Sequence, residues 1–360
     1  MRILHVTEAM GGGIVSFVDS ISRRQAEAGA DVSVLYTVRP DTPARDVMEA
    51  RFESRVTLLP PIDEGSTRRS VFTLMKETRR LARSGRFDAI HVHSSIAGVA
   101  CRLALIGVKT PLFYSPHGFA FLRESASRPA RAIYLWAERL FARKGTLIVT
   151  SATEVDLARK KLWASRVEYL QSGVPGDSLV ARERTEKPRP QVTMTARITY
   201  QKAPWRFAAV ARELSDLGEF VWVGGGPEHE IAEWIGDAPV TLLEWVTPEE
   251  LEEIFARTDV FLFPSLWEGM ALSLIQAQGR GLPAVTTDIV GNRDTVLHEK
   301  TGFVCATDEE LVEATRRLLL DAELRARMGK AAVEHVRAHF TDDRIGTDSI
   351  ALYEKASARQ

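Results

Sequence analysis

The chain has 360 residues, of which 45% are hydrophobic and 26% are charged, and its formal net charge is −1. The length is too great for one ordinary hydrophobic core and suits two α/β domains, while the composition is that of a soluble globular protein. No apolar run approaches the roughly 18 residues of a membrane-spanning helix. Residues 1–6 are expected to form a first strand rather than a secretion signal.

Charge is distributed unevenly along the chain. Residues 1–170 hold 26 Lys and Arg against 17 Asp and Glu, a net +9, whereas the remainder holds 21 against 31, a net −10. The first half is therefore expected to face something anionic. Nucleic acid is not the expected partner, because no aromatic residues interleave the charges. Four basic residues share one stripe of a predicted helix, interpreted either as a solvated face or as a contact with an anionic membrane surface: Arg69, Lys76, Arg80 and Arg83.

Short apolar runs alternate with amphipathic stretches from end to end, which is typical of parallel sheets with crossover helices. A helix is predicted after the first strand, because Ile14, Phe17, Val18 and Ile21 follow helical spacing. Strands in the first half are predicted near residues 2–7, 31–36, 55–58, 88–92, 111–115, 146–150 and 167–170.

A linker is predicted at residues 173–190, which are polar and contain several prolines. Strands follow near 191–196, 219–223, 239–243, 259–263 and 283–286, and two helices are predicted within 331–357. The predicted fold is therefore α/β, with Rossmann-like parallel-sheet domains at 1–172 and 191–340 facing each other across a cleft. The last helix, about 341–360, is expected to pack back on the first domain. Such folds bind ligands at the carboxyl ends of their strands.

Two strand ends of the first domain carry candidate ligand groups. Gly12 and Gly13 belong to a glycine-rich turn after the first strand, where the backbone can approach a ligand closely; an ordinary tight turn is the alternative. The turn does not match the dinucleotide-binding pattern G-x-G-x-x-G. His117 ends another strand and could exchange hydrogen bonds with a sugar, or could be purely structural.

Metal chemistry is not expected. His91 and His93 lie two residues apart, but no third ligand is spaced to join them. No Asp-x-Asp pair ends a strand, so carboxylates that would hold a divalent ion on a diphosphate are not predicted. The two cysteines, Cys101 and Cys305, are expected to be buried free thiols in a reducing cytosol.

The second domain begins with a pair of cations. Arg197 and Lys202 flank the turn after its first strand, and a guanidinium and an ammonium at this spacing suit two adjoining phosphates; a solvated pair is the alternative. Gly225 lies in a glycine-rich loop after the next strand, where a base or ribose could approach.

Residues 264–285 are the most informative stretch. An apolar strand ends at Pro264, and a helix is predicted to open at Glu268 and Gly269 and to continue to Gly279. Free N–H groups and the helix dipole attract an anion at such a terminus. The Glu268 carboxylate can accept hydrogen bonds from sugar hydroxyls beside that anion.

Taken together, these motifs resemble glycosyltransferase family 4, retaining enzymes of GT-B architecture, and within it a bacterial surface-polysaccharide subgroup. The resemblance spans almost the whole chain. It rests on the glycine-rich first turn, Ser-Pro-His-Gly at 115–118, Arg-x4-Lys at 197–202, Gly-Gly-Gly-Pro at 224–227, Pro-Ser-x-x-Glu-Gly at 264–269 and Gly-x-Pro at 281–283.

The resemblance implies retaining transfer of a sugar from a nucleoside-diphosphate sugar. It implies that Arg197 and Lys202 neutralise the diphosphate, that Glu268 holds sugar hydroxyls and that His117 contacts the sugar. These four residues form the expected catalytic set, with no cofactor and no metal. The expected donor-binding residues are Gly12, Gly13, Gly225, Gly269, Met270, Ala271, Leu272 and Gln276.

The chain departs from the family pattern at one position of the signature. The family has a glutamate eight residues after the first, where this chain has Gln276, and that glutamate accepts hydrogen bonds from both ribose hydroxyls. A neutral amide accepts only through its oxygen, so a weaker grip on ribose is expected. Ala196, Ala203 and Ala271 stand where the family often has glycine.

The predicted function is transfer of a hexose-type sugar, with a UDP-sugar favoured over a GDP-sugar, to a lipid-linked or saccharide acceptor in cell-surface polysaccharide biosynthesis. The protein is expected in the cytoplasm, peripheral on the inner membrane face. Two alternatives stay open: a non-catalytic nucleotide-sugar-binding subunit, because Gln276 breaks the signature, and a nucleotide-sugar epimerase of the same architecture.

Overall fold

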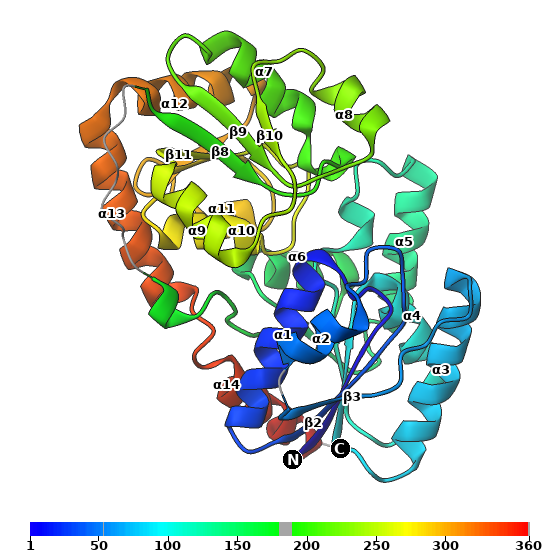
Figure 1. Ribbon diagram of the computed structural model, residues 1–360. Coiled ribbons are helices and arrows are strands. Elements are labelled where there is room, and N and C mark those ends of the chain that lie inside the picture. Colours follow the sequence, from blue (N-terminus) through cyan, green and yellow to red (C-terminus); the bar gives the residue numbers. More distant parts are fainter. Residues whose placement is uncertain (53, 180–188, 359–360) are drawn as a thin grey trace. The chain divides into compact units, whose positions relative to one another are not determined.

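The computed structural model describes residues 1–52, 54–179 and 189–358. Within them the chain forms two compact units, each built on a parallel sheet (Figure 1). The first unit comprises Met1–Leu122, Ala126–Ser172 and Asp342–Gln360, and the second comprises Arg123–Ser125 and Gly173–Thr341. The predicted α/β fold with two Rossmann-like sheets is confirmed.

The sheet of the first unit has seven strands in the order β3-β2-β1-β4-β5-β6-β7. Its strand order reverses direction between β1 and β4. The strands are β1 (Arg2–Thr7), β2 (Asp31–Tyr36), β3 (Val56–Leu58), β4 (Ala89–His93), β5 (Leu112–Ser115), β6 (Thr146–Val149) and β7 (Val167–Tyr169). The helices are α1 (Gly12–Glu27), α2 (Arg45–Phe52), α3 (Thr67–Arg83), α4 (Ser95–Ala104), α5 (Arg128–Phe141), α6 (Ala152–Leu162) and α14 (Ile345–Ser357), with a 3-10 turn η1 (Ala120–Leu122).

The sheet of the second unit has six strands in the order β10-β9-β8-β11-β12-β13. The strands are β8 (Gln191–Thr195), β9 (Glu219–Val223), β10 (Thr241–Leu243), β11 (Val260–Phe263), β12 (Ala284–Thr287) and β13 (Gly302–Cys305). The helices are α7 (Pro204–Leu214), α8 (Glu228–Trp234), α9 (Pro248–Arg257), α10 (Leu272–Gly279), α11 (Asn292–Thr295), α12 (Asp308–Leu320) and α13 (Ala322–His339), with 3-10 turns η2 (Gly176–Ser178) and η3 (Tyr200–Lys202).

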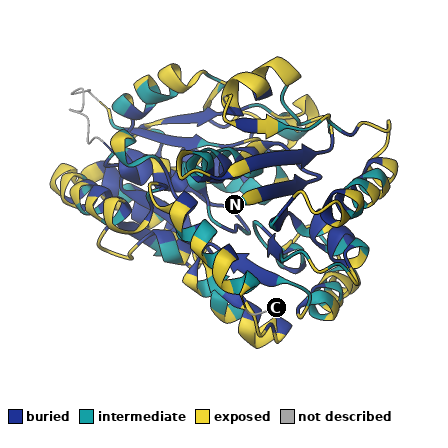
Figure 2. Cartoon of the chain, turned by 90° about the horizontal axis from the view of Figure 1, so that it is seen from below, coloured by how far each residue is buried: buried dark blue, intermediate teal, exposed yellow. Residues whose placement is uncertain are grey.

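Both sheets are buried, whereas the helices keep exposed outer faces (Figure 2). This is the usual consequence of helices covering a parallel sheet, and it explains why inner strands such as β6 and β11 consist mainly of apolar residues. Cys101 and Cys305 are free and buried, as predicted.

Three sequence predictions about element boundaries are wrong. Strand β13 was not predicted, because Gly302–Cys305 begins with glycine, which is depleted in strands. Helix α13 begins at Ala322, ahead of the predicted tail segment, where Asp321 caps it by accepting from Leu324 N. Helix α10 begins at Leu272, four residues after Glu268.

The first part of the predicted linker belongs to the second unit. Val174 N donates to Phe340 O at 2.9 Å, and a Cβ built on Gly173 would come within 1.6 Å of that carbonyl oxygen. Val174 and Leu179 are buried with Phe340 in one apolar cluster. Residues 173–179 therefore pack on the second unit, although their composition is that of a linker. Residues 180–188 of the predicted linker lie outside the described residues.

Helix α14 returns to the first unit and packs along α1 (Figure 1). Asp342, just before α14, accepts from Ser20 Oγ and Arg24 Nη2 of α1, each at 2.7 Å. Ile345 and Tyr353 are buried in the same apolar cluster as Phe113 of the sheet. The last helix is thus an integral part of the first unit's core.

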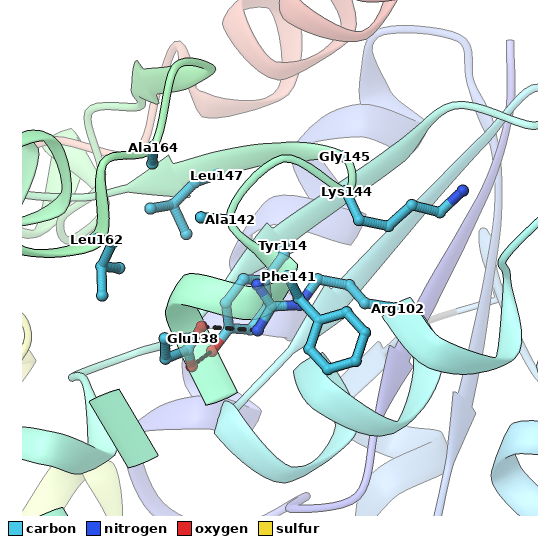
Figure 3. Close-up of a pocket in the computed structure, with 10 residues that line it drawn as sticks. All are labelled: Arg102, Tyr114, Glu138, Phe141, Ala142, Lys144, Gly145, Leu147, Leu162 and Ala164. Atoms are coloured by element: carbon cyan, nitrogen blue, oxygen red, sulfur yellow. Dashed lines mark hydrogen bonds and ion pairs between the residues drawn. The ribbon is translucent and has the colours of Figure 1, made fainter. Parts of the chain in front are cut away.

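A buried ion pair ties α4 and α5 to the sheet (Figure 3). Arg102 Nη2 lies 2.6 Å from Glu138 Oε2, and both side chains are 3% exposed. Tyr114 OH donates to the other carboxylate oxygen at 2.7 Å, and the Arg102 guanidinium lies over the Tyr114 ring. Burial, and then the negative charge of Glu138, raise the pKa of Tyr114.

Candidate active site

The loops that carry the second unit's candidate residues leave the sheet where its strand order changes direction. Strand β8 lies between β9 and β11, so the segments after β8 and β11 emerge side by side at the carboxyl edge. Open α/β sheets bind ligands at such a switch point. Residues 196–203 follow β8, and residues 264–271 follow β11.

Lys202 and Glu268 meet at this switch point. Lys202 Nζ lies 2.6 Å from Glu268 Oε1, although the two residues are 66 positions apart in sequence. The Glu268 carboxylate is 8% exposed, and the ammonium also lies 4.7 Å from the centre of the Phe263 ring. A pair held this tightly presents a fixed cation beside a fixed carboxylate.

Backbone contacts hold the two loops in register. Leu266 N donates to Gln201 O at 2.8 Å, and Gln201 Nε2 donates to Trp267 O at 2.7 Å. Because these bonds join the residues directly before Lys202 and Glu268, the fold itself brings the ion pair together.

Glu268 projects from a loop, not from the first turn of a helix as predicted. The Gly269 carbonyl packs under Gly291, where a Cβ would come within 1.9 Å of Gly269 O, and the left-handed backbone of Gly291 (φ +87°) permits this approach. The chain reaches helical geometry only after Ala271, whose backbone is extended. Alanine has no polar side-chain atom to cap the first turn of α10. Leu274 N donates to Ala271 O at 3.1 Å, and the N–H groups of Leu272 and Ser273 are the ones that a ligand can accept from.

The predicted donor-binding residues on this segment differ in what they can offer. Met270 and Leu272 pack against the apolar cluster around Ile275 and Val336, so their side chains serve the core and only their backbone can meet a ligand. Gly269 and Ala271 are buried, and Gln276 is exposed on α10.

Arg197 and Gly225 lie on joined loops at neighbouring strand ends. Ile198 N donates to Gly225 O at 2.9 Å, and Trp222 Nε1 donates to Ala196 O at 2.8 Å. A Cβ on Gly224, at φ +126°, would come within 2.3 Å of that same Ala196 oxygen, so only glycine allows the loops to touch. The Arg197 side chain is exposed.

In the first unit, Gly12 and Gly13 are the first two residues of α1 rather than a loop ahead of it. Both are exposed, and a Cβ built on Gly13 would meet no described atom within 4 Å. Gly11 precedes them and has no side chain with which to cap the helix. The start of α1 therefore offers bare N–H groups to open space.

His117 follows β5 in a left-handed conformation, at φ +54°, ahead of Gly118. The residue is partly buried, its ring packs edge-on against Phe17, and its Nε2 lies 3.0 Å from His93 Nδ1. Burial lowers the pKa of His117 to about 3, so its ring is neutral at physiological pH. A non-glycine residue in this region of backbone space indicates a site where the fold constrains a side chain for use.

The expectation that no third ligand joins His91 and His93 is wrong. Their nitrogens and those of His5 lie within 4.8 Å of one another, because β1 and β4 pair in parallel with His5 opposite His91. The three rings are fully buried and hydrogen-bonded to other side chains. Strand pairing, which the sequence pattern did not provide, brings them together; three histidines within otherwise apolar strands were the available signal.

The four basic residues of the predicted membrane contact are all exposed on α3. They are Arg69, Lys76, Arg80 and Arg83. Lys76 Nζ lies over the ring of Phe72, which is 56% exposed. No helix in the described ranges is both long enough and apolar enough to cross a membrane.

Comparison with known proteins identifies the family. Residues 12–173 match the model of the glycosyl transferase 4-like domain, and residues 189–321 match that of the glycosyl transferases group 1. The chain therefore belongs to the group 1, family 4 glycosyltransferases and has the GT-B fold.

Individual relatives are distant. An uncharacterized 41.2 kDa protein of the cps region of Klebsiella pneumoniae is 22% identical over 84% of this chain and 86% of its own length. The UDP-Gal:α-D-GlcNAc-diphosphoundecaprenol α-1,3-galactosyltransferase of Escherichia coli is 29% identical over 62% of this chain and 64% of its own. Among solved structures, sucrose-phosphate synthase from Thermosynechococcus elongatus superposes with a TM-score of 0.84 at 18% identity, covering 100% of both chains.

Proposed function

We propose that the protein is a retaining glycosyltransferase that moves a hexose-type sugar from a UDP-sugar to a lipid-linked or saccharide acceptor in cell-surface polysaccharide biosynthesis. The name of the Escherichia coli relative combines a UDP-sugar donor with a diphosphoundecaprenol acceptor, and the Klebsiella pneumoniae relative is encoded in a cps region. Both support this choice of donor and pathway.

The observation that carries the proposal is the Lys202–Glu268 pair at the switch point, beside the uncapped start of α10. One group is a cation suited to phosphate, and the other is a carboxylate suited to hydroxyls. Lys202 has three N–H donors, so it can keep Glu268 in place while it donates to a diphosphate. A nucleoside-diphosphate sugar needs both kinds of contact at adjacent positions.

These groups would stabilise the departing diphosphate. Breaking the bond between sugar and phosphate develops negative charge on the leaving group. Lys202 is a fixed donor for that charge, and Arg197 and the first N–H groups of α10 can also donate to it. Preorganised donors of this kind stabilise the transition state more than the ground state, which is what accelerates a reaction. We also propose that the backbone N–H groups of Gly12 and Gly13 bind the donor.

For the stereochemical course, we propose same-face displacement assisted by the leaving phosphate. Glu268 is already engaged with Lys202, so it is a poor nucleophile toward the anomeric carbon. Mass spectrometry of the enzyme quenched during turnover would find no glycosyl-enzyme adduct; a trapped covalent adduct would refute this course.

Because the sequence has no Asp-x-Asp pair, we also propose that turnover does not need a divalent metal, and excess chelator is expected to leave the rate unchanged.

A peripheral contact with an anionic membrane surface would bring the enzyme to a lipid-linked acceptor. Helix α4 packs between α3 and α5, and α5 exposes Ile133, Trp136 and Leu140 at i, i+3 and i+7, by 67%, 61% and 76%. Together with the basic residues of α3, this apolar stripe has the composition of a surface that inserts shallowly into anionic lipid. Binding to anionic vesicles, but not to zwitterionic ones, would support the contact, and a Trp136→Ser variant that binds as well as wild type would contradict it.

The decisive experiment is a panel of UDP- and GDP-sugars tested for binding and turnover with wild type and Lys202→Met. Loss of this cation is expected to lower kcat by about 10²–10³-fold. The control is Lys300→Met, which removes an exposed positive charge elsewhere in the second unit and is expected to keep the wild-type kcat. No binding and no hydrolysis of any donor would sink the enzyme proposal. Binding without turnover would favour a binding subunit, and conversion of the donor alone into another nucleotide-sugar would favour an epimerase.

A further inference from the structure

A chain of buried hydrogen bonds connects His117 with the interior of the first unit. His117 Nε2 lies 3.0 Å from His93 Nδ1, His93 Nε2 lies 2.8 Å from His5 Nδ1, and His5 Nε2 lies 2.8 Å from Gln25 Oε1. A neutral imidazole has one N–H and one lone pair. The position of the proton at one end of this chain therefore determines its position on every ring.

The far end of the network is fixed by a backbone carbonyl of β6. The Ser115 hydroxyl donates its only hydrogen to Ile148 O at 3.0 Å, since a carbonyl can only accept. Ser115 Oγ must then accept from His91 Nε2, 2.9 Å away, which leaves the lone pair on His91 Nδ1. That lone pair accepts from Tyr353 OH at 2.7 Å, so the Tyr353 oxygen can act toward its other neighbour only as an acceptor.

Helix α14 orients the Gln25 amide through two such oxygens. Ser349 Oγ donates to Gly346 O at 2.9 Å, so it too is an acceptor toward its other neighbour. Gln25 Nε2 lies 2.8 Å from Ser349 Oγ and 3.3 Å from Tyr353 OH. Two acceptors on α14 require the amide nitrogen to face them, and Gln25 Oε1 consequently faces His5.

The orientation of the Gln25 amide determines which ring nitrogen of His5, His93 and His117 carries the proton. Because Gln25 Oε1 can only accept, His5 carries its proton on Nε2 and its lone pair on Nδ1. His93 must then donate from Nε2 to His5, and His117 must donate from Nε2 to His93 Nδ1. The remaining ring nitrogen of His117, Nδ1, is left with a lone pair.

This order of protons holds when all four rings are neutral, and the hydrogen bonds that join the rings involve no carboxylate. Burial lowers the pKa of His5 to about 4 and that of His117 to about 3. Burial also holds the pKa values of His91 and His93 well below the usual range, and the neighbouring histidines lower them further. At neutral pH the only variable left is which nitrogen of each ring carries the proton.

We propose that Gln25 is a positioning residue that, through His5 and His93, fixes His117 as the Nε2–H tautomer and so makes its Nδ1 an acceptor for a hydroxyl group of the transferred sugar. The contact between His117 Nδ1 and the sugar rests on the proposed function, whereas the tautomer of His117 does not. An Nδ1–H tautomer could only donate at that atom. The acceptor role selects a sugar with a hydroxyl at the contacted carbon over a deoxy sugar there, because the hydroxyl supplies the matching donor.

The tautomers can be measured without any substrate. In 15N-labelled protein at neutral pH, long-range 1H–15N correlation spectra distinguish protonated from unprotonated ring nitrogens. We expect His5, His91, His93 and His117 all to carry the proton on Nε2. A proton on Nδ1 of His117 would overturn the proposal, whatever the protein does with nucleotide-sugars.

Gln25→Met tests whether Gln25 is the cause, since methionine has similar length and no oxygen to hold His5. His117 is expected to lose its single tautomer, which would appear as averaged 15N shifts. Ser22→Ala is the matched control: Ser22 is equally buried on α1, but its hydroxyl bonds only within that helix, to Val18 O and Asp19 O. An unchanged His117 signal in Gln25→Met would refute the causal role.

A binding comparison separates this proposal from the proposed function. Gln25→Met is expected to weaken binding of the UDP-sugar that wild type uses by about fivefold, the worth of one neutral hydrogen bond, and to leave binding of UDP unchanged. Equal weakening of both ligands would mean a structural defect and would count against a positioning role. If wild type binds no nucleotide at all, the proposed function fails, while the tautomer assignment still stands or falls on the spectra.

Discussion

Gly13 combines two properties that make it a sharp test of the first unit's site. It is exposed in the first turn of α1, its φ is not in the left-handed region, and a Cβ there would meet no described atom within 4 Å. Alanine should therefore fit without strain and should stabilise the protein by about 0.4–1 kcal/mol by restricting the unfolded chain. The same methyl group would crowd a donor that binds the N–H groups of this turn, so kcat/KM should fall by about 10²-fold.

Thermal unfolding and steady-state kinetics of Gly13→Ala give the two readouts. A raised Tm with lost activity is the expected combination. Full activity would show that no ligand approaches Gly13, and a lowered Tm would show that the space around this residue is not open.

Gln276 tests the departure from the family signature. Its side chain is exposed on α10, so a carboxylate can be introduced there without a burial cost. Gln276→Glu would replace a neutral acceptor of the ribose hydroxyls by a charged one, and binding of the UDP-sugar should tighten several-fold, by about 1 kcal/mol. Calorimetry would measure the change, with pyrophosphate, which has no ribose, as the control ligand. An unchanged Kd would mean that Gln276 does not touch ribose.

The candidate site was predictable from sequence where it depends on the ends of strands. Lys202 and Glu268 are distant in sequence, yet each follows a strand by a few residues, and neighbouring parallel strands bring such positions together. The connection of His117 to Gln25 was not predictable, because it depends on which rings face each other across β1 and β4 and on a helix contributed by the far end of the chain.

At the scale of elements, the Arg102–Glu138 pair is a buried electrostatic link between α4 and α5 (Figure 3). Glu138→Gln would leave the Arg102 charge buried without a counter-charge and should cost about 3–5 kcal/mol of stability. The double variant Arg102→Met with Glu138→Leu should recover much of this loss, since two apolar side chains can fill the same space without desolvating a charge.

Urea unfolding of these variants would measure the cost, with Asp156→Asn on α6 as the control. Asp156 pairs with Lys160 at 2.9 Å, but their side chains are 64% and 75% exposed, so breaking that pair should cost less than about 1 kcal/mol. Similar losses for Glu138→Gln and Asp156→Asn would show that the buried pair is no more valuable than a surface one.

Prediction of the elements succeeded where local composition is clear and failed where tertiary contacts decide. All seven strands of the first sheet were predicted, because each is a short, mostly apolar or β-branched segment between helical stretches. The start of α10 was not, since the contact between Gly269 and Gly291 involves a loop more than 20 residues downstream. Residues 173–179 resembled a linker in composition, but a backbone bond to Phe340 makes them part of the second unit.

At the scale of the whole molecule, the buried histidines of the first unit should make the protein acid-labile. Each has a pKa that burial lowers below its value in the unfolded chain, about 6.5. The unfolded chain therefore takes up protons below pH 6.5 that the folded chain refuses, and stability falls as pH falls. Glu8 acts in the opposite direction, because burial raises the pKa of its carboxyl, but it is one group against four.

The expected profile is flat above about pH 7 and declines between about pH 6.5 and 4, by up to about 1.4 kcal/mol per pH unit for each histidine. Urea unfolding of the full chain from pH 7.5 to 5, followed by a probe in the first unit, would measure it. The slope of the unfolding free energy against pH depends only on how many more protons the unfolded chain binds. His5→Gln removes one of the four buried histidines and should therefore lower this slope by about a quarter, whatever it does to stability at pH 7.5. A first unit whose stability did not change between pH 6.5 and 5 would mean that burial does not lower the pKa values of its histidines.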